Sequence, residues 1–194
     1  MTGKLTGIQA INTSPLDNGF CEKASKKFGI CKNCYSRRML STFRGGCRPS
    51  WKRNGEVLSD SPLPYWAVPR LAPGWVRLHA HGELLNLQHL KNFWAIARDN
   101  PHTFFVLWTK RMDLIRQAET PENARVIYSN PVVDRVLTRP PVGADMVFNV
   151  VSDQKDPRAT CRGKCIDCAL CYKKDNPPYV VEILQKPGKR VEPE

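Results

Sequence analysis

The chain has 194 residues, which is enough for one domain with a full hydrophobic core. Thirty lysines and arginines against eighteen acidic residues give a formal net charge of +12, and there are eight cysteines. No apolar run approaches the roughly 18 residues of a membrane span, and the first ten residues lack the pattern of a signal peptide. These features argue against a membrane or secreted protein, so we expect a cytoplasmic protein with no membrane partner.

A short strand is expected near the N-terminus, followed by a cysteine-rich loop. Residues 5–12 are predicted to form this strand, which ends at the turn signal SPLDNG. Residues 45–74 are rich in Pro, Gly and Arg and predict an irregular connection with one short helix. Aromatic side chains are expected to anchor this part of the chain to the core. They are Trp51, Tyr65, Trp66 and Trp75.

The positive charge is concentrated beside the first cysteines. Ten basic residues lie between Cys21 and Arg53, and Glu22 is the only acid among them. Such a patch attracts an anionic partner, which would be nucleic acid, a nucleotide or other phosphate-bearing substrate, or an anionic thiolate cluster. A solvated basic face explains the charge equally well, because charge alone carries no site information.

From Trp75 onward, predicted strands alternate with predicted helices. A helix is expected at residues 87–97, with Asn86 as its cap and Asn100 followed by Pro101 as its stop. A shorter helix is expected at 113–118. The predicted strands are residues 75–80, 103–108, 124–129 and 145–151. Apolar strands that alternate with helices predict an α/β protein with a parallel sheet covered on both faces.

Polar side chains follow the strands of the predicted sheet. In parallel α/β proteins the working residues lie at the carboxyl ends of the strands, so we expect these side chains to share one rim with the first cysteines. The candidate cofactor-binding residues on this rim are Gly82, Glu83, Lys110, Ser129 and Asn149. Glu83 has a second interpretation, in which it caps the helix that follows it. His79 and His81 would bind metal, move a proton or simply be hydrogen bonded at the rim.

The cysteines form two sets with the spacing of metal ligands. Two thiolates two residues apart can hold one metal or cluster from a single turn. Disulfides between such near neighbours would close tiny loops, and a reducing compartment disfavours them. The first set is Cys21, Cys31, Cys34 and Cys47, and the second is Cys161, Cys165, Cys168 and Cys171. The second set looks closed by four protein ligands, which suits structural zinc or an auxiliary iron-sulfur cluster.

The first half of the chain resembles the radical S-adenosylmethionine (radical SAM) superfamily. The resemblance is carried by a strand, a loop that ends in KNCY at residues 32–35, and a second strand followed by HGELLN at residues 81–86. It implies a partial (β/α) barrel and a [4Fe-4S] cluster on Cys21, Cys31 and Cys34. One iron would stay open for SAM, whose amino group would meet the Gly82–Glu83 pair. The reaction would release a 5'-deoxyadenosyl radical. The C-x9-C-x2-C spacing and the His-Gly-Glu-Leu sequence depart from the usual C-x3-C-x2-C and Gly-Gly-Glu-Pro.

The chain also looks similar to uncharacterised phage and bacterial proteins with a late C-x-x-C-Y loop and a T-K-R segment. WTKR at residues 108–111 carries this second likeness, and the resemblance covers most of residues 1–171. It implies a phage origin, and therefore the host cytoplasm, but no known reaction. We expect residues 1–155 to form the barrel domain with its cysteine loop. Residues 156–194 would form a cysteine-rich extension packed on the same domain.

The role of Cys47 decides between two functions. If Cys47 is a ligand, the first site is full and SAM cleavage is not expected; we favour three ligands, because Cys47 lies beyond Cys34 and next to Gly45 and Gly46. In a third arrangement, Cys31 and Cys34 join two C-terminal cysteines around one metal. The function is therefore either that of a radical SAM-like enzyme with an unknown substrate or that of a non-enzymatic phage protein. In the second case an iron-sulfur cluster or zinc is a scaffold for binding nucleic acid or a host protein.

Overall fold

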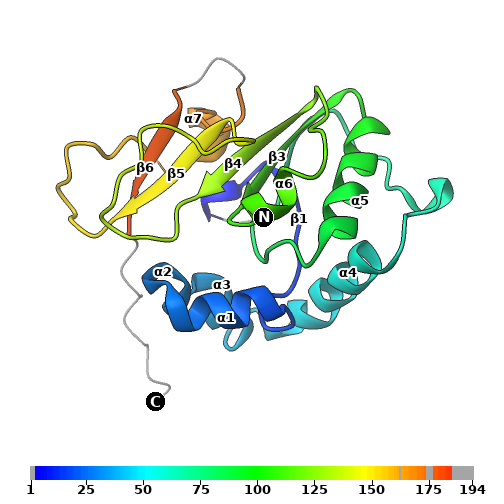
Figure 1. Ribbon diagram of the computed structural model, residues 1–194, viewed down its shortest axis with the longest axis horizontal. Helices are drawn as coiled ribbons and strands as arrows, with labels where there is room; N and C mark the ends of the chain where they lie inside the picture. Colours follow the sequence, from blue (N-terminus) through cyan, green and yellow to red (C-terminus); the bar gives the residue numbers. More distant parts are fainter. Residues whose placement is uncertain (1–2, 162, 174–176, 185–194) are drawn as a thin grey trace.

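The computed structural model describes residues 3–161, 163–173 and 177–184. Within this part of the chain, parallel strands in sequential order form one sheet (Figure 1). The strands are β1 (Gln9–Ile11), β2 (Gly74–Leu78), β3 (Thr103–Thr109), β4 (Ala124–Ser129), β5 (Met146–Val151) and β6 (Tyr179–Ile183). The predicted α/β fold with a parallel sheet is confirmed. A strand order without reversal is that of a partial (β/α) barrel, whereas a doubly wound sheet reverses direction at a switch point.

The strands agree with their predicted positions except at the two edges of the sheet. The prediction for β4 matches at both ends, and those for β2, β3 and β5 are off by at most two residues. β1 is shorter than predicted, because residues 3–5 form the 3-10 helix η1 (Gly3–Leu5) instead. β6 was not predicted; it lies in the expected C-terminal extension and pairs with β5 from Val147 to Val151. Residues 185–194 of that extension lie outside the described residues.

Helix α5 (Leu87–Arg98) forms where the sequence predicts it. The side chain of Asn86 caps it by accepting a hydrogen bond from the backbone N–H of His89 at 2.9 Å. Its apolar face, with Leu90, Phe93 and Ala97 fully buried, packs against the sheet. Helix α6 (Met112–Ile115) is shorter than the helix predicted at 113–118.

The cysteine loop is largely helical, and the helix in the connection after it is longer than predicted, whereas residues 61–64 and 68–73 are irregular as expected. Helix α4 is thirteen residues long and buries Trp51 and Leu58. Pro49 lies in its first turn, where proline favours a helix start and does not break the helix. Figure 1 shows α1, α2 and α3 along the side of the sheet at which the strands end, with α4 next to α5. The elements are α1 (Gly19–Lys27), α2 (Gly29–Lys32), α3 (Tyr35–Leu40), η2 (Gly45–Cys47), α4 (Arg48–Asp60) and η3 (Tyr65–Ala67).

The anchoring role predicted for the aromatic residues holds for Trp51 and Trp75 only. Trp51 is buried, and the ring of Trp75 stacks on Tyr172 with 5.4 Å between centroids. Tyr65 and Trp66 are 71% and 85% exposed, so for these two the prediction is wrong. Both lie on η3, which projects from the rest of the chain without burying its aromatic rings.

The sheet carries a separate hydrophobic cluster on each face. On the outer face, Leu78, Leu107 and Val126 pack with α5. On the inner face, Val106, Ile127, Met146 and Val180 pack with Tyr172 and with the cysteines of the second set. The segment between β5 and β6, including α7 (Cys165–Cys168), therefore covers the inner face of the sheet.

The two edges of the sheet are joined by one ion pair. Lys4 on η1, just before β1, pairs with Glu182 on β6, and both side chains are mostly buried. Since β1 and β6 are the outermost strands, this contact links the first and last strands of the sheet. No helix in the described residues is long and apolar enough to cross a membrane.

Candidate functional site

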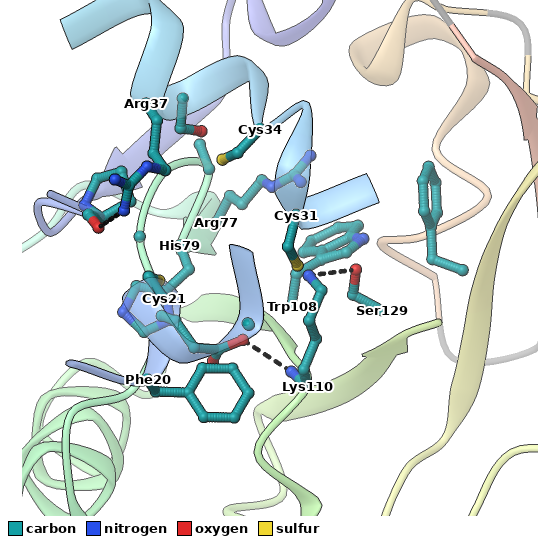
Figure 2. A pocket seen from close by; sticks show the side chains of 17 residues that line it. Phe20, Cys21, Cys31, Cys34, Arg37, Arg77, His79, Trp108, Lys110 and Ser129 are labelled. Atoms are coloured by element: carbon teal, nitrogen blue, oxygen red, sulfur yellow. Dashed lines mark hydrogen bonds between the residues drawn. The ribbon is translucent and has the colours of Figure 1, made fainter. Parts of the chain in front are cut away.

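Three cysteines of the first set line one cavity of about 180 Å³ at the carboxyl ends of β2, β3 and β4 (Figure 2). Cys21 comes from α1, Cys31 from α2, and Cys34 from the residue that precedes α3. Cys47 is not among the lining residues; it ends η2 and precedes α4. Cys47 therefore does not line the cavity that the other three cysteines share.

Asn18 ties the first cysteine helix to the loop that follows β2. Its Oδ1 accepts hydrogen bonds from the backbone N–H groups of Phe20 (2.9 Å) and Cys21 (3.2 Å). Its Nδ2 donates to the backbone carbonyl oxygen of Glu83 at 2.8 Å. An asparagine before a helix is a strong N-cap, and this cap also fixes the position of Cys21 relative to Glu83.

Gly82 is required by a close approach of two backbone segments. Its φ is +99°, and a Cβ atom there would meet the side chain and backbone of Thr13. The backbone N–H of Thr13 donates to the carbonyl oxygen of His81 at 3.1 Å, and the N–H of His81 donates to Asn12 Oδ1 at 2.9 Å. The loop after β2 is therefore fastened to the chain that follows β1.

The carboxylate of Glu83 is buried and held by neutral donors. Oε1 accepts from Thr109 Oγ1 at 2.5 Å and from the N–H of Leu84 at 2.9 Å, and Oε2 accepts from the N–H of Lys110 at 2.8 Å. A carboxylate has about four acceptor positions, so Glu83 keeps capacity for one more donor on the side that faces the cavity. It does not cap α5, because Asn86 has that role.

Cations of the cavity lie close to the thiols. Lys110 Nζ donates to Ser129 Oγ at 3.1 Å, and Figure 2 shows this lysine beside Cys31. Burial raises the pKa of the Cys31 thiol, and the charge of Lys110 opposes that shift; burial likewise raises the pKa of Cys21. Without metal these thiols stay protonated, so a metal or cluster would bind by displacing protons, which Lys110 favours.

The two histidines after β2 have different environments. His79 lines the cavity with a φ of +61°, and both of its ring nitrogens are buried without a hydrogen-bond partner in the described residues. Burial and nearby positive charges hold the pKa of His79 well below its usual value, so the ring is neutral. His81 is hydrogen bonded to Ser36 Oγ at 2.8 Å and stacked on Trp51. His81 is therefore the hydrogen-bonded rim histidine, and His79 is the one that faces the cavity.

Asn149 lies away from the cavity, unlike the other predicted cofactor-binding residues. Gly82, Glu83, Lys110 and Ser129 all line the cavity. Asn149 Oδ1 accepts from Asn130 Nδ2 (2.9 Å) and from the N–H of Leu137 (3.0 Å), and its Nδ2 donates to the Leu137 carbonyl oxygen (2.9 Å). Its fully buried side chain thus holds the loop after β4 against β5.

The second cysteine set lines a smaller cavity on the inner face of the sheet. Arg77, Trp108 and Phe148 line this cavity and the first one as well. Burial raises the pKa of Cys171 to about 12, and the charge of Arg77 opposes that shift. The two sets therefore line different but adjoining cavities. The cysteines of the second cavity are Cys161, Cys165, Cys168 and Cys171.

All eight cysteines are free thiols, as expected for metal ligands and not for disulfides. As placed in the described part of the chain, no three His, Cys, Asp or Glu side chains are grouped so that they could hold one metal ion. The thiols thus surround cavities without forming a compact single-ion site.

The model of one protein family, gene product 88, matches residues 3–134. The chain belongs to the gene product 88 family. The match includes the first cysteine set together with Glu83, Lys110 and Ser129, and it ends before Asn149 and the second set. No curated protein and no solved structure matches the chain.

Several residues of the site in this gene product 88 protein were not predicted from its sequence. Arg77 and Trp108 form a wall between the cavities, with the Arg77 guanidinium carbon 3.8 Å from the centroid of the Trp108 ring. Asn18 positions Cys21. A signal existed for Arg77, which is a charged residue inside a strand, and for Asn18, because asparagine is a preferred N-cap residue.

Proposed function

We propose that this gene product 88 protein is an iron-sulfur protein of the radical SAM type, with a [4Fe-4S] cluster held by Cys21, Cys31 and Cys34. One observation supports this most directly: the three thiols come from separate elements to one cavity at the carboxyl edge of a parallel sheet, beside Gly82 and Glu83. Cys47 lies outside that cavity, in keeping with three protein ligands and one iron open for SAM.

The donors of the cavity suit such a cluster. Cysteine thiolates are the usual ligands of iron-sulfur clusters. A four-iron cluster is bound at its corners, so its cysteines are spread more widely than the ligands of a single ion, in agreement with thiols that surround a cavity. Lys110 and Arg77 offset the negative charge of the cluster and its thiolates. When bound, the cluster would supply the electron for reductive cleavage of SAM.

Residues of the chain have separate roles toward SAM in this proposal. The buried Glu83 carboxylate accepts a hydrogen bond from the ammonium group, because it has an unused acceptor position. The Gly82 backbone lies at the cavity wall with no side chain. The Lys110 ammonium group, which is hydrogen bonded to Ser129, would attract the carboxylate group of SAM. The substrate class favoured by the basic N-terminal region is a nucleotide or nucleic acid.

The second set would hold its own centre, either another iron-sulfur cluster or zinc. Its four thiols share one cavity, which supports a site closed by protein ligands.

Anaerobic purification followed by iron, sulfide and zinc analysis tests these assignments. Cys31→Ala should remove the iron and sulfide of the first site, and Cys47→Ala is the matched control that should keep them. Loss of the first cluster in Cys47→Ala would refute the three-ligand site. Two zinc ions and no acid-labile sulfide in the unchanged protein would overturn both cluster assignments.

SAM binding has a separate test. Addition of SAM should change the electron paramagnetic resonance spectrum of the reduced cluster, and Glu83→Gln should weaken that change. An unchanged spectrum together with no reductive cleavage of SAM would refute the enzymatic function.

The exposed aromatic rings of η3 favour a second candidate function, which is non-enzymatic binding of nucleic acid with metal as scaffold. Trp66 is 85% exposed, and Arg70 lies over the ring of Tyr65 at 5.1 Å. Exposed aromatic rings beside a cation provide a stacking surface for unpaired bases. A single-stranded oligonucleotide should then quench Trp66 fluorescence, and Trp66→Ala should weaken binding severalfold. Equal binding by the variant would exclude this surface and leave a host protein as the other partner.

A further inference from the structure

Arg77 projects from β2 onto the inner face of the sheet. Its neighbours in β2, Val76 and Leu78, are fully buried in the hydrophobic cluster of the outer face. Since side chains alternate along a strand, Arg77 points the opposite way, into the concave side of the sheet. There its side chain lines the first cavity as well as the second.

The wall between the two cavities consists of Arg77, Trp108 and Phe148. The guanidinium carbon of Arg77 lies 3.8 Å from the centroid of the Trp108 ring, which fixes the cation in place. Figure 2 shows the guanidinium group above Trp108 and near Cys31 and Cys34. On the other side, Arg77 lines the second cavity together with all four cysteines of the second set. One cation therefore faces both cysteine sets.

The second cavity also has hydrogen-bond donors that lack acceptors. Trp108 Nε1 and Arg77 Nε are buried and have no hydrogen-bond partner of good geometry in the described residues. Tyr172 Oη lies close enough to Arg77 to interact with its side chain, but its own proton has no acceptor there. All three residues line the second cavity. Buried donors are almost always satisfied in proteins, so unsatisfied donors in a cavity lined by four thiols indicate that an acceptor belongs there. Metal-bound thiolates, or the sulfides of a cluster, are acceptors of the required negative charge.

We infer that Arg77 is a positioning cation shared by the two cysteine sites, which stabilises the metal-bound thiolates of both at once. This inference rests on the proposed function, because it requires a centre at each site. Arg77 is partly buried, and a charge that lies between two anionic centres away from bulk water is less screened than one on the surface. Arg77 therefore slows metal loss at either site and raises the reduction potential of each iron-sulfur centre.

The effect of Arg77 on each cysteine site can be measured separately in variants that keep only one of the two sites. Cys31→Ala with Cys34→Ala leaves only the second site, and Cys168→Ala with Cys171→Ala leaves only the first. In each background, Arg77→Gln should speed metal loss to EDTA severalfold and lower the midpoint potential of an iron-sulfur centre in a dithionite titration. Arg77→Lys, which keeps the charge, should restore most of both properties, and circular dichroism should show that all variants are folded.

Arg37→Gln is the matched control, because Arg37 lines the first cavity and not the second. It should affect the first site only. If Arg77→Gln changed metal loss at only one site or at neither, the shared role would be overturned. Failure of the proposed function is recognised separately, by metal and sulfide analysis of the unchanged protein. If both sites hold zinc, the rates of metal loss still decide the role of Arg77.

Discussion

A Cβ atom on Gly82 would lie 2.2 Å from Oγ1 of Thr13, closer than real side chains allow. Gly82→Ala would also place a side chain at a φ of +99°. Backbone strain and overpacking each cost about 1–3 kcal/mol, so we expect the free energy of unfolding to fall by at least about 2 kcal/mol in urea denaturation. Gly46→Ala, with no atom near its Cβ position, is the control and should change stability by less than about 1 kcal/mol. Equal stability of the two variants would contradict the close approach.

The carboxylate of Glu83 should contribute to stability independently of any ligand. The carboxylate of Glu83 accepts hydrogen bonds from buried backbone N–H groups. In Glu83→Gln an amide NH2 group would face such an N–H group, and buried donors would be left without an acceptor. We expect a loss of about 1–3 kcal/mol in the metal-free protein, measured by urea denaturation. Glu56→Gln removes a carboxylate from an exposed pair with Lys52 and should cost less than about 1 kcal/mol. A variant at position 83 as stable as the one at position 56 would show that the buried hydrogen bonds are not formed.

Asn149 is expected to act in stability and not in cofactor binding. Asn149→Ala would leave the Leu137 backbone and the Asn130 side chain without their partner. Thermal unfolding should show a loss of about 1–3 kcal/mol, whereas SAM affinity and iron content of the folded variant should be unchanged. Gln154→Ala, at an exposed position, serves as the control. Weaker SAM binding with unchanged stability would instead restore the cofactor-binding role.

Acid should destabilise the metal-free protein through its buried histidines. Burial lowers the pKa of His81 to about 4 and that of His89 to about 3, against an ordinary value of 6.5. The unfolded chain therefore binds more protons in this interval. The contribution of these two histidines to the free energy of unfolding is fully present above pH 6.5 and is lost as the pH falls toward 4.

Urea midpoints measured at pH 7, 5.5 and 4.5 should decrease in that order. His81→Gln should show a shallower decrease, and His102→Gln, at an exposed position, serves as the control. A midpoint that stays constant from pH 7 to pH 4.5 would contradict the burial of these rings.

Residues 74–151 were predictable because each element carries its own local signal. β3 and β4 are apolar runs of strand length, and Asn86 and Asn100 mark the limits of α5. Helix α4 lacked such a signal, because its buried face consists of Trp51, Gly55 and Leu58 only and a proline lies in its first turn. Its helical form depends on contacts with α5, which the local sequence does not display.

The sequence predicts which residues lie near the ends of the strands, but it does not predict in which direction each side chain points. Glu83, Lys110 and Ser129 lie at or just beyond the ends of their strands and line the cavity. In β5 the residue that pairs with Ser129 is Phe148, which lines the cavity, and the next residue, Asn149, points to the other face and enters a hydrogen-bond network. The role of Arg77 depends on which face of the sheet is concave. The segment between β5 and β6, which brings the second cysteine set to the same face, lies far from Arg77 in the sequence.

The Lys4–Glu182 ion pair joins the first and the last strand of the sheet, so it can form only after β6 has been made. β6 leaves the ribosome after every other strand of the sheet, so the curved sheet and its second cavity are completed late. Cys21, Cys31 and Cys34 precede β2, β3 and β4 in the chain, so they are made before the strands whose ends form their cavity. Nascent chains would therefore display three reactive thiols before any wall exists to shield them, which makes oxygen a hazard to maturation before it is a hazard to the folded protein.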